Sequence, residues 1–188
     1  QATVFTSRHL KEFYASSEKR FPNPVVIGNP FDFESNQDLK SSTSRAYDCA
    51  FIGRLEPEKG IDLFIQLAGA LPNRRFVVAG GGSRKAVLET QSEHPPNLEY
   101  LGEITSLETA RLMSESKLTI IPPLWQEPFG RVAIEALSFG SLPLMTRSGG
   151  LKEIAEKIHA PELCVQSHSL SDWIMKVQQS LQVVENAG

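Results

Sequence analysis

Short apolar runs alternate with stretches of helical periodicity along most of the chain. Six such runs predict buried strands, at residues 48–52, 75–79, 98–101, 117–121, 142–145 and 162–165. Helical patterns follow them, near residues 60–71, 84–93, 106–115, 129–139, 150–157 and 169–184. Strands that alternate with helices form parallel sheets with right-handed crossovers. The pattern therefore predicts an α/β fold, a doubly wound, Rossmann-like parallel sheet.

A different pattern precedes this alternation. Residues 2–6 and 25–27 predict two short strands, and Ser7 is placed as the N-cap of a helix between them. Residues 34–47 are polar and nearly featureless, which predicts a linker or an exposed loop. We therefore expect two parts, a segment at residues 1–33 and a domain at residues 46–188.

The composition narrows the class of protein. The 188 residues are 40% apolar and 22% charged, as in an ordinary globular domain. The net charge of -3 provides no broad basic surface, so we expect no nucleic-acid partner. No apolar run approaches the ~20 residues of a transmembrane helix. Cys49 and Cys164 lie far apart in apolar surroundings, which favours two reduced thiols in a cytoplasmic protein.

The residues that follow the strands are the candidates for a ligand site, because doubly wound sheets bind ligands beyond the carboxyl ends of their strands. The first such loop begins at Gly53-Arg54 and ends at Lys59. Arg54 offers a rigid donor fork, and Lys59 stands just before a helix, so the two cations suit a diphosphate. A solvated loop in which they pair with Glu56 and Glu58 explains the local pattern equally well.

Two glycine-rich turns carry weaker signals. The turn at residues 80–82 lacks the complete spacing of a dinucleotide fingerprint, so a plain tight turn is favoured there. Ser148-Gly149-Gly150 precedes a helix and fits an anion cradle or a simple helix cap equally well.

The strongest candidate chemistry lies in residues 125–140. Glu127 stands just ahead of a predicted helix, whose first amides, at Phe129, Gly130 and Arg131, suit a phosphate or a polarised hydroxyl. Glu135 is embedded in an apolar stretch of that helix, where a carboxylate needs donors. We favour ribose hydroxyls as those donors over an i, i+4 pair with Arg131. The sequence has no Asp-x-Asp pair and no His or Cys cluster, so it predicts neither a metal nor a cofactor.

Several of these motifs recur in the order and spacing of one known family. They are Val26-Ile-Gly-Asn-Pro-Phe-Asp32, Gly53-Arg-Leu-Glu-Pro-Glu-Lys-Gly60, Val77-Val-Ala-Gly-Gly-Gly82, Tyr100-Leu-Gly-Glu-Ile104, Glu127-Pro-Phe-Gly130 and Glu135-Ala136. Together they resemble the C-terminal, donor-binding domain of a retaining GT-B-fold glycosyltransferase of the family 4, or group 1, type. The resemblance runs from about Val25 to Glu156. Pro30 stands where the family has Gly, and Lys152 where it has Pro.

The resemblance implies a role for each matching residue. Arg54 and Lys59 would neutralise the diphosphate of a nucleotide sugar, with Gly53 beside them. Glu127 would contact a sugar hydroxyl, and Glu135 would bind the ribose. The amides of Phe129, Gly130 and Arg131 would touch sugar and phosphate, and the backbone at Ile104 would meet the base.

The resemblance also implies the activity and the missing parts of the enzyme. Such an enzyme transfers a hexose, with retention and without a metal, from a nucleoside-diphosphate sugar to a glycan, lipid or small molecule. Its acceptor-binding domain lies N-terminal, so residues 1–33 read as a remnant of that domain with its linker. The present chain would then bind its donor without turnover. Peripheral membrane contact of the full enzyme is compatible with this interpretation. A GT-B-fold nucleotide-sugar epimerase and a non-catalytic nucleotide-binding module are the alternatives.

Overall fold

The computed structural model describes residues 2–16, 21–27, 45–90 and 92–187. The family-like turn that ends at Asp32 and most of the expected linker, residues 34–44, lie outside these residues. Six parallel strands form the main sheet: β3 (Tyr47–Ile52), β4 (Phe76–Ala79), β5 (Leu98–Tyr100), β6 (Ser116–Ile121), β7 (Leu142–Thr146) and β8 (Cys164–Val165). Their order, β5-β4-β3-β6-β7-β8, is that of a Rossmann sheet. The predicted α/β, doubly wound fold is confirmed.

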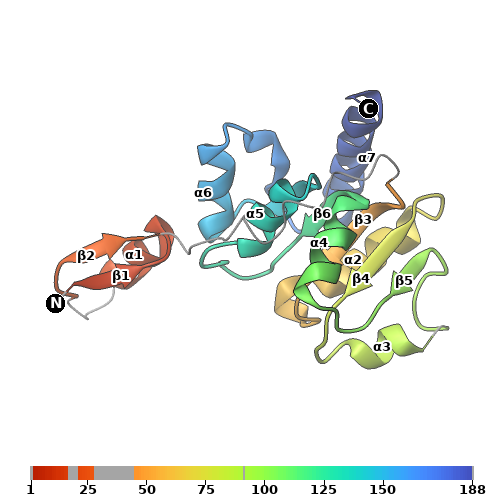
Figure 1. Cartoon of the computed structure of the whole chain (residues 1–188), viewed down its shortest axis with the longest axis horizontal. Coiled ribbons are helices and arrows are strands. Elements are labelled where there is room, and N and C mark those ends of the chain that lie inside the picture. The colour runs from red at the N-terminus through yellow and green to blue at the C-terminus, as the bar shows by residue number, and fades with distance from the viewer. Residues whose placement is uncertain (1, 17–20, 28–44, 91, 188) are drawn as a thin grey trace.

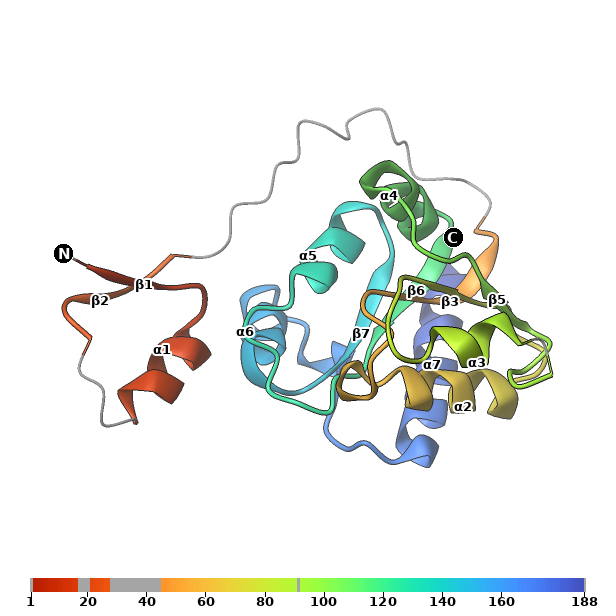
Figure 2. The ribbon, with the colours of Figure 1, turned by 90° about the horizontal axis from the view of Figure 1, so that it is seen from below.

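Helices cover both faces of this sheet. They are α2 (Ile61–Ala70), α3 (Lys85–Glu89), α4 (Ser106–Ser114), α5 (Arg131–Ser138), α6 (Gly149–Lys157) and α7 (Leu170–Ala187). Figures 1 and 2 show α2, α3 and α7 on one face and α4 and α5 on the other. The connection from β3 to β4 runs through α2, and the connection from β5 to β6 runs through α4 in the opposite direction across the sheet. Right-handed crossovers therefore place these two helices on opposite faces.

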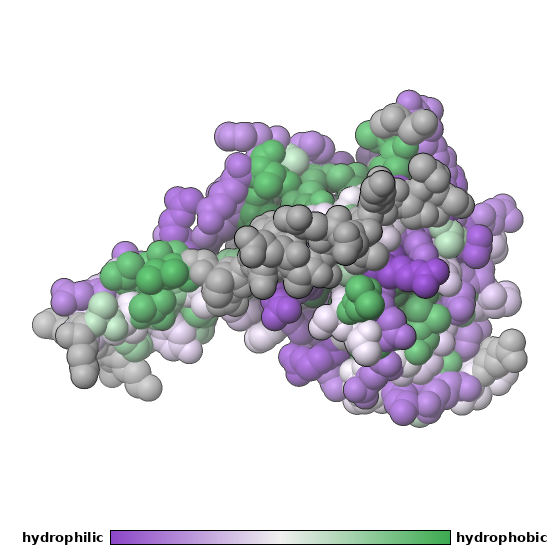
Figure 3. All heavy atoms as spheres, viewed as in Figure 1, coloured by the Kyte–Doolittle hydropathy of each residue, from purple (hydrophilic) through white to green (hydrophobic). Residues whose placement is uncertain are grey.

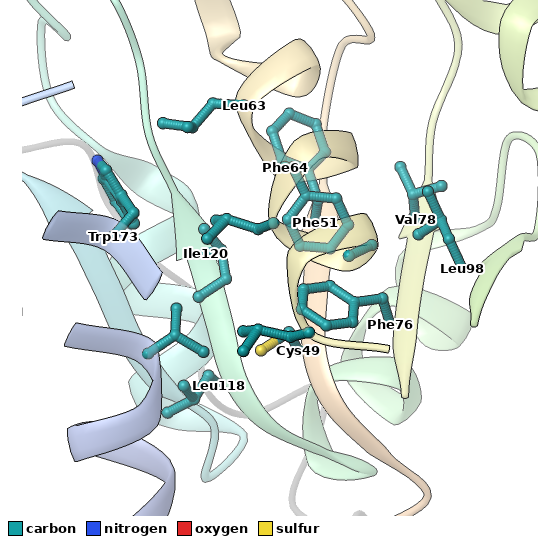
Figure 4. Close-up of a cluster of buried hydrophobic side chains, with 14 of the residues drawn as sticks. Cys49, Phe51, Leu63, Phe64, Phe76, Val78, Leu98, Leu118, Ile120 and Trp173 are labelled. Atoms are coloured by element: carbon teal, nitrogen blue, oxygen red, sulfur yellow. The ribbon is translucent and has the colours of Figure 1, made fainter. Parts of the chain in front are cut away.

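The core follows the two-residue period of the strands. On β3, Cys49 and Phe51 belong to the large cluster under α2 and α7, whereas Ala50 belongs to a small cluster under α4. Phe64 of α2 packs in the large cluster, with its ring centroid 5.5 Å from that of Phe51. Figure 4 shows these two rings near Phe76, with Ile120 between them and Trp173. This packing fixes the carboxyl ends of β3 and β6, where a ligand site is expected.

The N-terminal residues form a small second sheet. Strands β1 (Thr3–Phe5) and β2 (Pro24–Val26) pair in parallel, and α1 (Arg8–Ala15) connects them. The hydroxyl of Ser7 accepts a hydrogen bond from the Leu10 amide at 3.1 Å, which confirms its role as the N-cap of α1. Large apolar side chains of this unit are exposed, and they are Val4, Phe13, Tyr14, Val25, Val26 and Ile27. Figure 3 shows a hydrophobic patch over this unit, at the left of the molecule.

Three predicted elements are markedly shorter in the structure, while others differ by one or two residues. The helix expected at 84–93 ends at Glu89, since Thr90 is already extended and two prolines follow at 95–96. The strand expected at 162–165 is only Cys164–Val165, because Pro161 begins a 3-10 helix, η3 (Pro161–Leu163). The helix expected from residue 129 begins at Arg131, because Gly130 takes a left-handed conformation at its N-cap.

Candidate functional site

A cavity of about 220 Å³ lies beyond the carboxyl ends of β3 and β6. The strand order reverses between these two strands, which is where doubly wound sheets bind ligands. Six residues singled out in the sequence line this switch-point cavity: Gly53, Arg54, Lys59, Glu127, Gly130 and Arg131. The structure therefore brings together residues from two separate loops, the one after β3 and the one between β6 and α5.

Lys59 is the cation most firmly held at this cavity. It ends the 3-10 helix η2 (Pro57–Lys59), and Gly60 then turns the chain into α2. Its Nζ lies 2.7 Å from Glu127 Oε2, and the two side chains are only 23% and 17% exposed. The same ammonium stands 4.8 Å from the ring centroid of Trp125. An ion pair and an aromatic face thus hold one positive charge at the cavity wall.

Arg54 is held much more loosely. Its side chain is 63% exposed, and its nearest carboxylate oxygen, Oε1 of Glu58, is 4.0 Å away. An exposed pair at this separation contributes little to stability. Glu56 instead accepts hydrogen bonds from the side chain and backbone of Ser83, which lower the pKa of its carboxyl group. Arg54 therefore has its ion-pair partner, Glu58, within its own loop, as the alternative interpretation expects. Lys59 does not, because its partner Glu127 lies in another loop.

The N-terminus of α5 presents free backbone donors. The amides of Phe129, Gly130 and Arg131 have no hydrogen-bond acceptor among the residues that the structure describes. Gly130, Arg131 and Val132 line the switch-point cavity. Unpaired first-turn amides and the helix dipole together favour an anion at this point. Lys59 on the facing loop adds an ammonium group, which is paired with Glu127 in this structure.

Glu135 is mostly buried and lies outside the lining of the switch-point cavity. Its side chain is 14% exposed, and its Oε1 accepts a hydrogen bond from Nε of Arg131 at 2.6 Å. The structure thus contains the i, i+4 pair that the sequence offered as the alternative to a ligand. A role for Glu135 in binding ribose stays a prediction.

Ile104 lies in an adjacent cavity on the β4 side of the loop after β3. This cavity measures about 420 Å³, and Gly80, Gly81 and Glu103 also line it. Ile52, Gly53 and Arg54 line both cavities. The two hollows therefore meet at the end of β3, and an elongated ligand that passes Arg54 would reach both.

The glycines at residues 149–150 serve the loop that carries Glu127. The amide of Gly150 donates to the carbonyl of Glu127 at 2.7 Å, and that of Gly149 donates to Gln126 Oε1 at 3.0 Å. A Cβ on Gly150 would come within 2.6 Å of the Phe129 backbone, so only glycine permits this approach. Because both amides are already paired, these residues hold the loop and do not form an anion cradle.

The plain-turn interpretation also holds for residues 80–82. A Cβ on Gly80 would lie 1.9 Å from the carbonyl oxygen of Gly53, so this turn must be glycine to pack beneath the loop after β3. The amide of Leu55 donates to the Gly81 carbonyl at 2.8 Å. The glycine turn therefore packs against the loop that carries Arg54 and is hydrogen-bonded to it.

Sequence reasoning assigned no role to Trp125, which contacts Lys59 across the cavity rim. Its presence two residues before Glu127 was the only available signal, and no local pattern ties it to a residue in another loop.

In the described part of the chain, no group of His, Cys, Asp and Glu has a metal-binding arrangement. Among the same residues, no helix has both the length and the apolar character needed to cross a bilayer.

Fold and site together define an α/β domain of the Rossmann type, with a cavity at its switch point that is lined by Lys59 and by the start of α5. The family described as "Glycosyl transferases group 1" matches residues 33–182. A Klebsiella pneumoniae protein, named as an uncharacterized 42.6 kDa protein in the cps region, is 34% identical over 79% of this chain and 37% of its own length. The gpi3 subunit of phosphatidylinositol N-acetylglucosaminyltransferase from Schizosaccharomyces pombe is 32% identical over 69% of this chain and 30% of its own length.

Solved structures agree with this assignment at the level of the fold. HepE of Anabaena, in complex with UDP and glucose, aligns with a TM-score of 0.71 at 19% identity over 98% of this chain and 56% of its own. WaaG, a glycosyltransferase involved in lipopolysaccharide biosynthesis, aligns with a TM-score of 0.71 at 16% identity over 95% of this chain and 53% of its own. The chain belongs to the group 1 glycosyltransferase family, and its fold matches GT-B glycosyltransferase structures. It spans about a third of the length of the curated relatives that it matches.

Proposed function

We propose that this chain is the donor-binding part of a retaining glycosyltransferase that transfers a hexose from a nucleoside-diphosphate sugar. The observation that carries the proposal is the convergence of Lys59 with Gly130 and Arg131, whose backbone amides are unpaired at the start of α5, on one cavity. A diphosphate needs both positive charge and backbone donors, and this cavity offers both. The exposed fork of Arg54, at the mouth of the cavity, completes the diphosphate site.

The two connected cavities suit the rest of such a donor. The sugar lies beside Glu127 in the switch-point cavity, and the base lies beside the Ile104 backbone in the adjacent one. Arg54, which lines both, stands where the diphosphate joins the two halves. Glu135 binds the ribose by exchanging its contact with Arg131, whose side chain is 70% exposed and free to move away.

In the transfer step the diphosphate leaves the sugar as negative charge develops on its oxygens. Lys59 and the α5 amides are fixed before that charge appears, so they stabilise the transition state without reorganising. These groups supply the neutralising charge in place of a metal ion, and we propose metal-independent transfer for that reason. HepE, a structural neighbour of this chain, is described with UDP and glucose bound.

The acceptor site belongs, in this proposal, to an N-terminal domain of the whole protein. Two features support it: the chain spans about a third of its curated relatives, and the β1–α1–β2 unit exposes apolar side chains. A neighbouring domain that covers them would complete the small sheet. The proposed acceptor is a glycan, a lipid or a small molecule. The proposed location is the cytoplasm. Any peripheral membrane contact would be made by the whole enzyme.

Isothermal titration of the chain with UDP, GDP and ADP tests the proposal. We expect one nucleotide to bind with a millimolar or tighter dissociation constant. Lys59→Ala should weaken that binding by about 10- to 100-fold, since it removes one charge-assisted contact. Glu135→Ala should weaken it as well, because the ribose loses its acceptor.

Lys85→Ala is the matched control. Lys85 carries the same charge, pairs with Glu89 at 3.4 Å and lines neither cavity. Its removal should leave the dissociation constant unchanged. Absence of binding to all three nucleotides, or equal losses in the Lys59 and Lys85 variants, would contradict the proposed donor site. Conversion of a bound nucleotide sugar into its epimer would favour an epimerase instead.

A further inference from the structure

The N-terminal unit and the site loop are joined by hydrogen bonds that the family resemblance gave no reason to expect. Residues 122–130, the β6–α5 loop, carry Glu127 at their centre. The hydroxyl of Ser7, just before α1, donates to the carbonyl of Pro128 at 2.5 Å. This bond crosses from the small sheet to the residue next to Glu127. The side chain of Ser7 is buried, so water does not compete for the contact.

Glu153 of α6 makes the second link. One of its carboxylate oxygens accepts the amide of His9 at 2.5 Å, and the other accepts the amide of Arg8 at 3.1 Å. Both amides belong to the first turn of α1, where a negative charge also meets the positive end of the helix dipole. The side chain of Glu153 is only 15% exposed. Ser7 and Glu153 therefore fasten the same helix end from two directions.

The third link joins the start of α6 to the β6–α5 loop. The first residues of this helix, Gly149 and Gly150, donate their amides to Gln126 and Glu127 of the β6–α5 loop. The loop is thus bound on one side by α6 and on the other by Ser7. Glu153 sits one turn along α6 and holds α1 against both. The three contacts form one continuous connection from the small sheet to the backbone of Glu127.

We propose that Glu153 is a positioning residue, which docks the start of α1 onto α6 and thereby places the Glu127 loop at the sugar end of the donor site. The inference rests on the proposed function for its link to the sugar. The docked α1 fixes Pro128 through Ser7, and this fixes the orientation in which Glu127 meets a sugar hydroxyl. Movement of the N-terminal part relative to the donor domain therefore changes the contacts of the sugar, and has only a weak effect on the binding of the nucleotide.

Two measurements test the inference on this chain. The first needs no ligand: amide exchange by nuclear magnetic resonance at Arg8, His9, Gly149 and Gly150. Glu153→Ala should accelerate exchange at all four amides, and Glu153→Gln, which keeps one acceptor oxygen, should have a smaller effect. Ser7→Ala should accelerate exchange at Gly150 without altering the core of the large sheet.

The matched control is Glu156→Gln. Glu156 lies on the same helix, lines the same hollow between α1 and α6, and forms an ion pair with Lys152 at 3.7 Å. Its replacement should leave all four exchange rates unchanged. Faster exchange at Arg8 and His9 with no change at Gly150 in Glu153→Ala would overturn the proposal, because α1 would then be docked without any effect on the loop.

The second measurement compares a nucleotide sugar with its own nucleotide, as UDP-glucose with UDP, GDP-mannose with GDP and ADP-glucose with ADP. For the pair that binds, Glu153→Ala and Ser7→Ala should weaken the nucleotide sugar by about 2- to 10-fold, the range of one neutral hydrogen bond, and leave the nucleotide nearly unchanged. Equal losses for both ligands would overturn the positioning role. If no nucleotide binds, the donor site itself is wrong, and the exchange rates alone decide whether the connection exists.

Discussion

The chain contains two units of the same design with very different surroundings. In both β3–α2–β4 and β1–α1–β2, a helix connects two parallel, hydrogen-bonded strands. In the first unit every residue of β4 is buried, as are five residues of α2. In the second unit no residue of α1 is buried and all of β2 is exposed.

The difference lies in the neighbours of each unit. A strand–helix–strand unit buries only the surface between its helix and its strands, so the other sheet face and both strand edges need further partners. β3 and β4 find them in β6, β5 and α4. Among the described residues, β1 and β2 pair as strands only with each other, and a two-stranded sheet alone is marginally stable. In place of further strands and helices, the small unit has the aromatic contacts of Phe5 with Tyr14 and Phe21 and its hydrogen bonds to Glu153 and Pro128.

The largest test of this comparison replaces one phenylalanine in each unit. Phe64→Ala should lower the free energy of unfolding by about 3 to 5 kcal/mol, because it opens a cavity between Phe51 and Phe76 in the core. Phe13→Ala, on α1, removes a ring from a residue that is 59% exposed and should change stability by about 0.5 kcal/mol or less. Urea denaturation followed by circular dichroism measures both. Similar losses in the two variants would show that the small unit has a core of its own.

The sequence predicts the large unit well because its physics is local and repetitive. The two-residue period of β3 and the helical period of α2 each appear within one short window, and right-handed crossovers then fix the order of the sheet. The cavity position follows from that order, which is why Gly53, Lys59 and Glu127 were all found. The exposure of β2 was not foreseeable, since the run Val25-Val26-Ile27 reads like any buried strand.

Pairings across long sequence separations escaped sequence reasoning. The contact between Lys59 and Glu127 joins residues 68 positions apart, and that between His9 and Glu153 joins residues 144 apart. Local charge patterns suggest Glu56 and Glu58 as the partners of Arg54 and Lys59, because a sequence shows only near neighbours. The chosen partners depend on how the loops meet after the sheet has formed. By contrast, the pair of Arg131 with Glu135 lies within one helical turn and was foreseen as an alternative.

A smaller test uses acid to loosen the last helix of the large unit. Glu185 of α7 accepts hydrogen bonds from Lys117 and Arg74 at 2.8 and 2.7 Å, and these lower the pKa of its carboxyl group. A depressed pKa in the folded state stabilises the fold at neutral pH, and this contribution is lost as the pH falls through the folded pKa. Glu185→Gln should therefore cost up to about 1 kcal/mol at pH 7, since the carboxylate is partly exposed, and almost nothing near pH 3.

Urea denaturation of wild type and variant at several pH values measures this difference. Glu89→Gln is the control, because Glu89 makes an exposed pair with Lys85, and its replacement should change the free energy of unfolding by about 0.5 kcal/mol or less at any pH. A penalty for Glu185→Gln that stayed constant down to pH 3 would mean that packing, and not charge, ties α7 to the sheet.

The smallest expected effect on stability comes from the exposed face of the small unit. Val4 and Ile27 are 55% and 56% exposed, so the double replacement Val4→Thr, Ile27→Thr should change the free energy of unfolding by about 0.5 kcal/mol or less. Threonine keeps the branched shape that strands favour, so the backbone should not change. What should change is the binding of an apolar dye such as 8-anilinonaphthalene-1-sulfonate, which we expect to fall because the patch has lost two of its apolar residues. The same replacement on a covered face would lower stability and leave dye binding unaltered, so the pair of measurements decides whether this sheet is open to a partner.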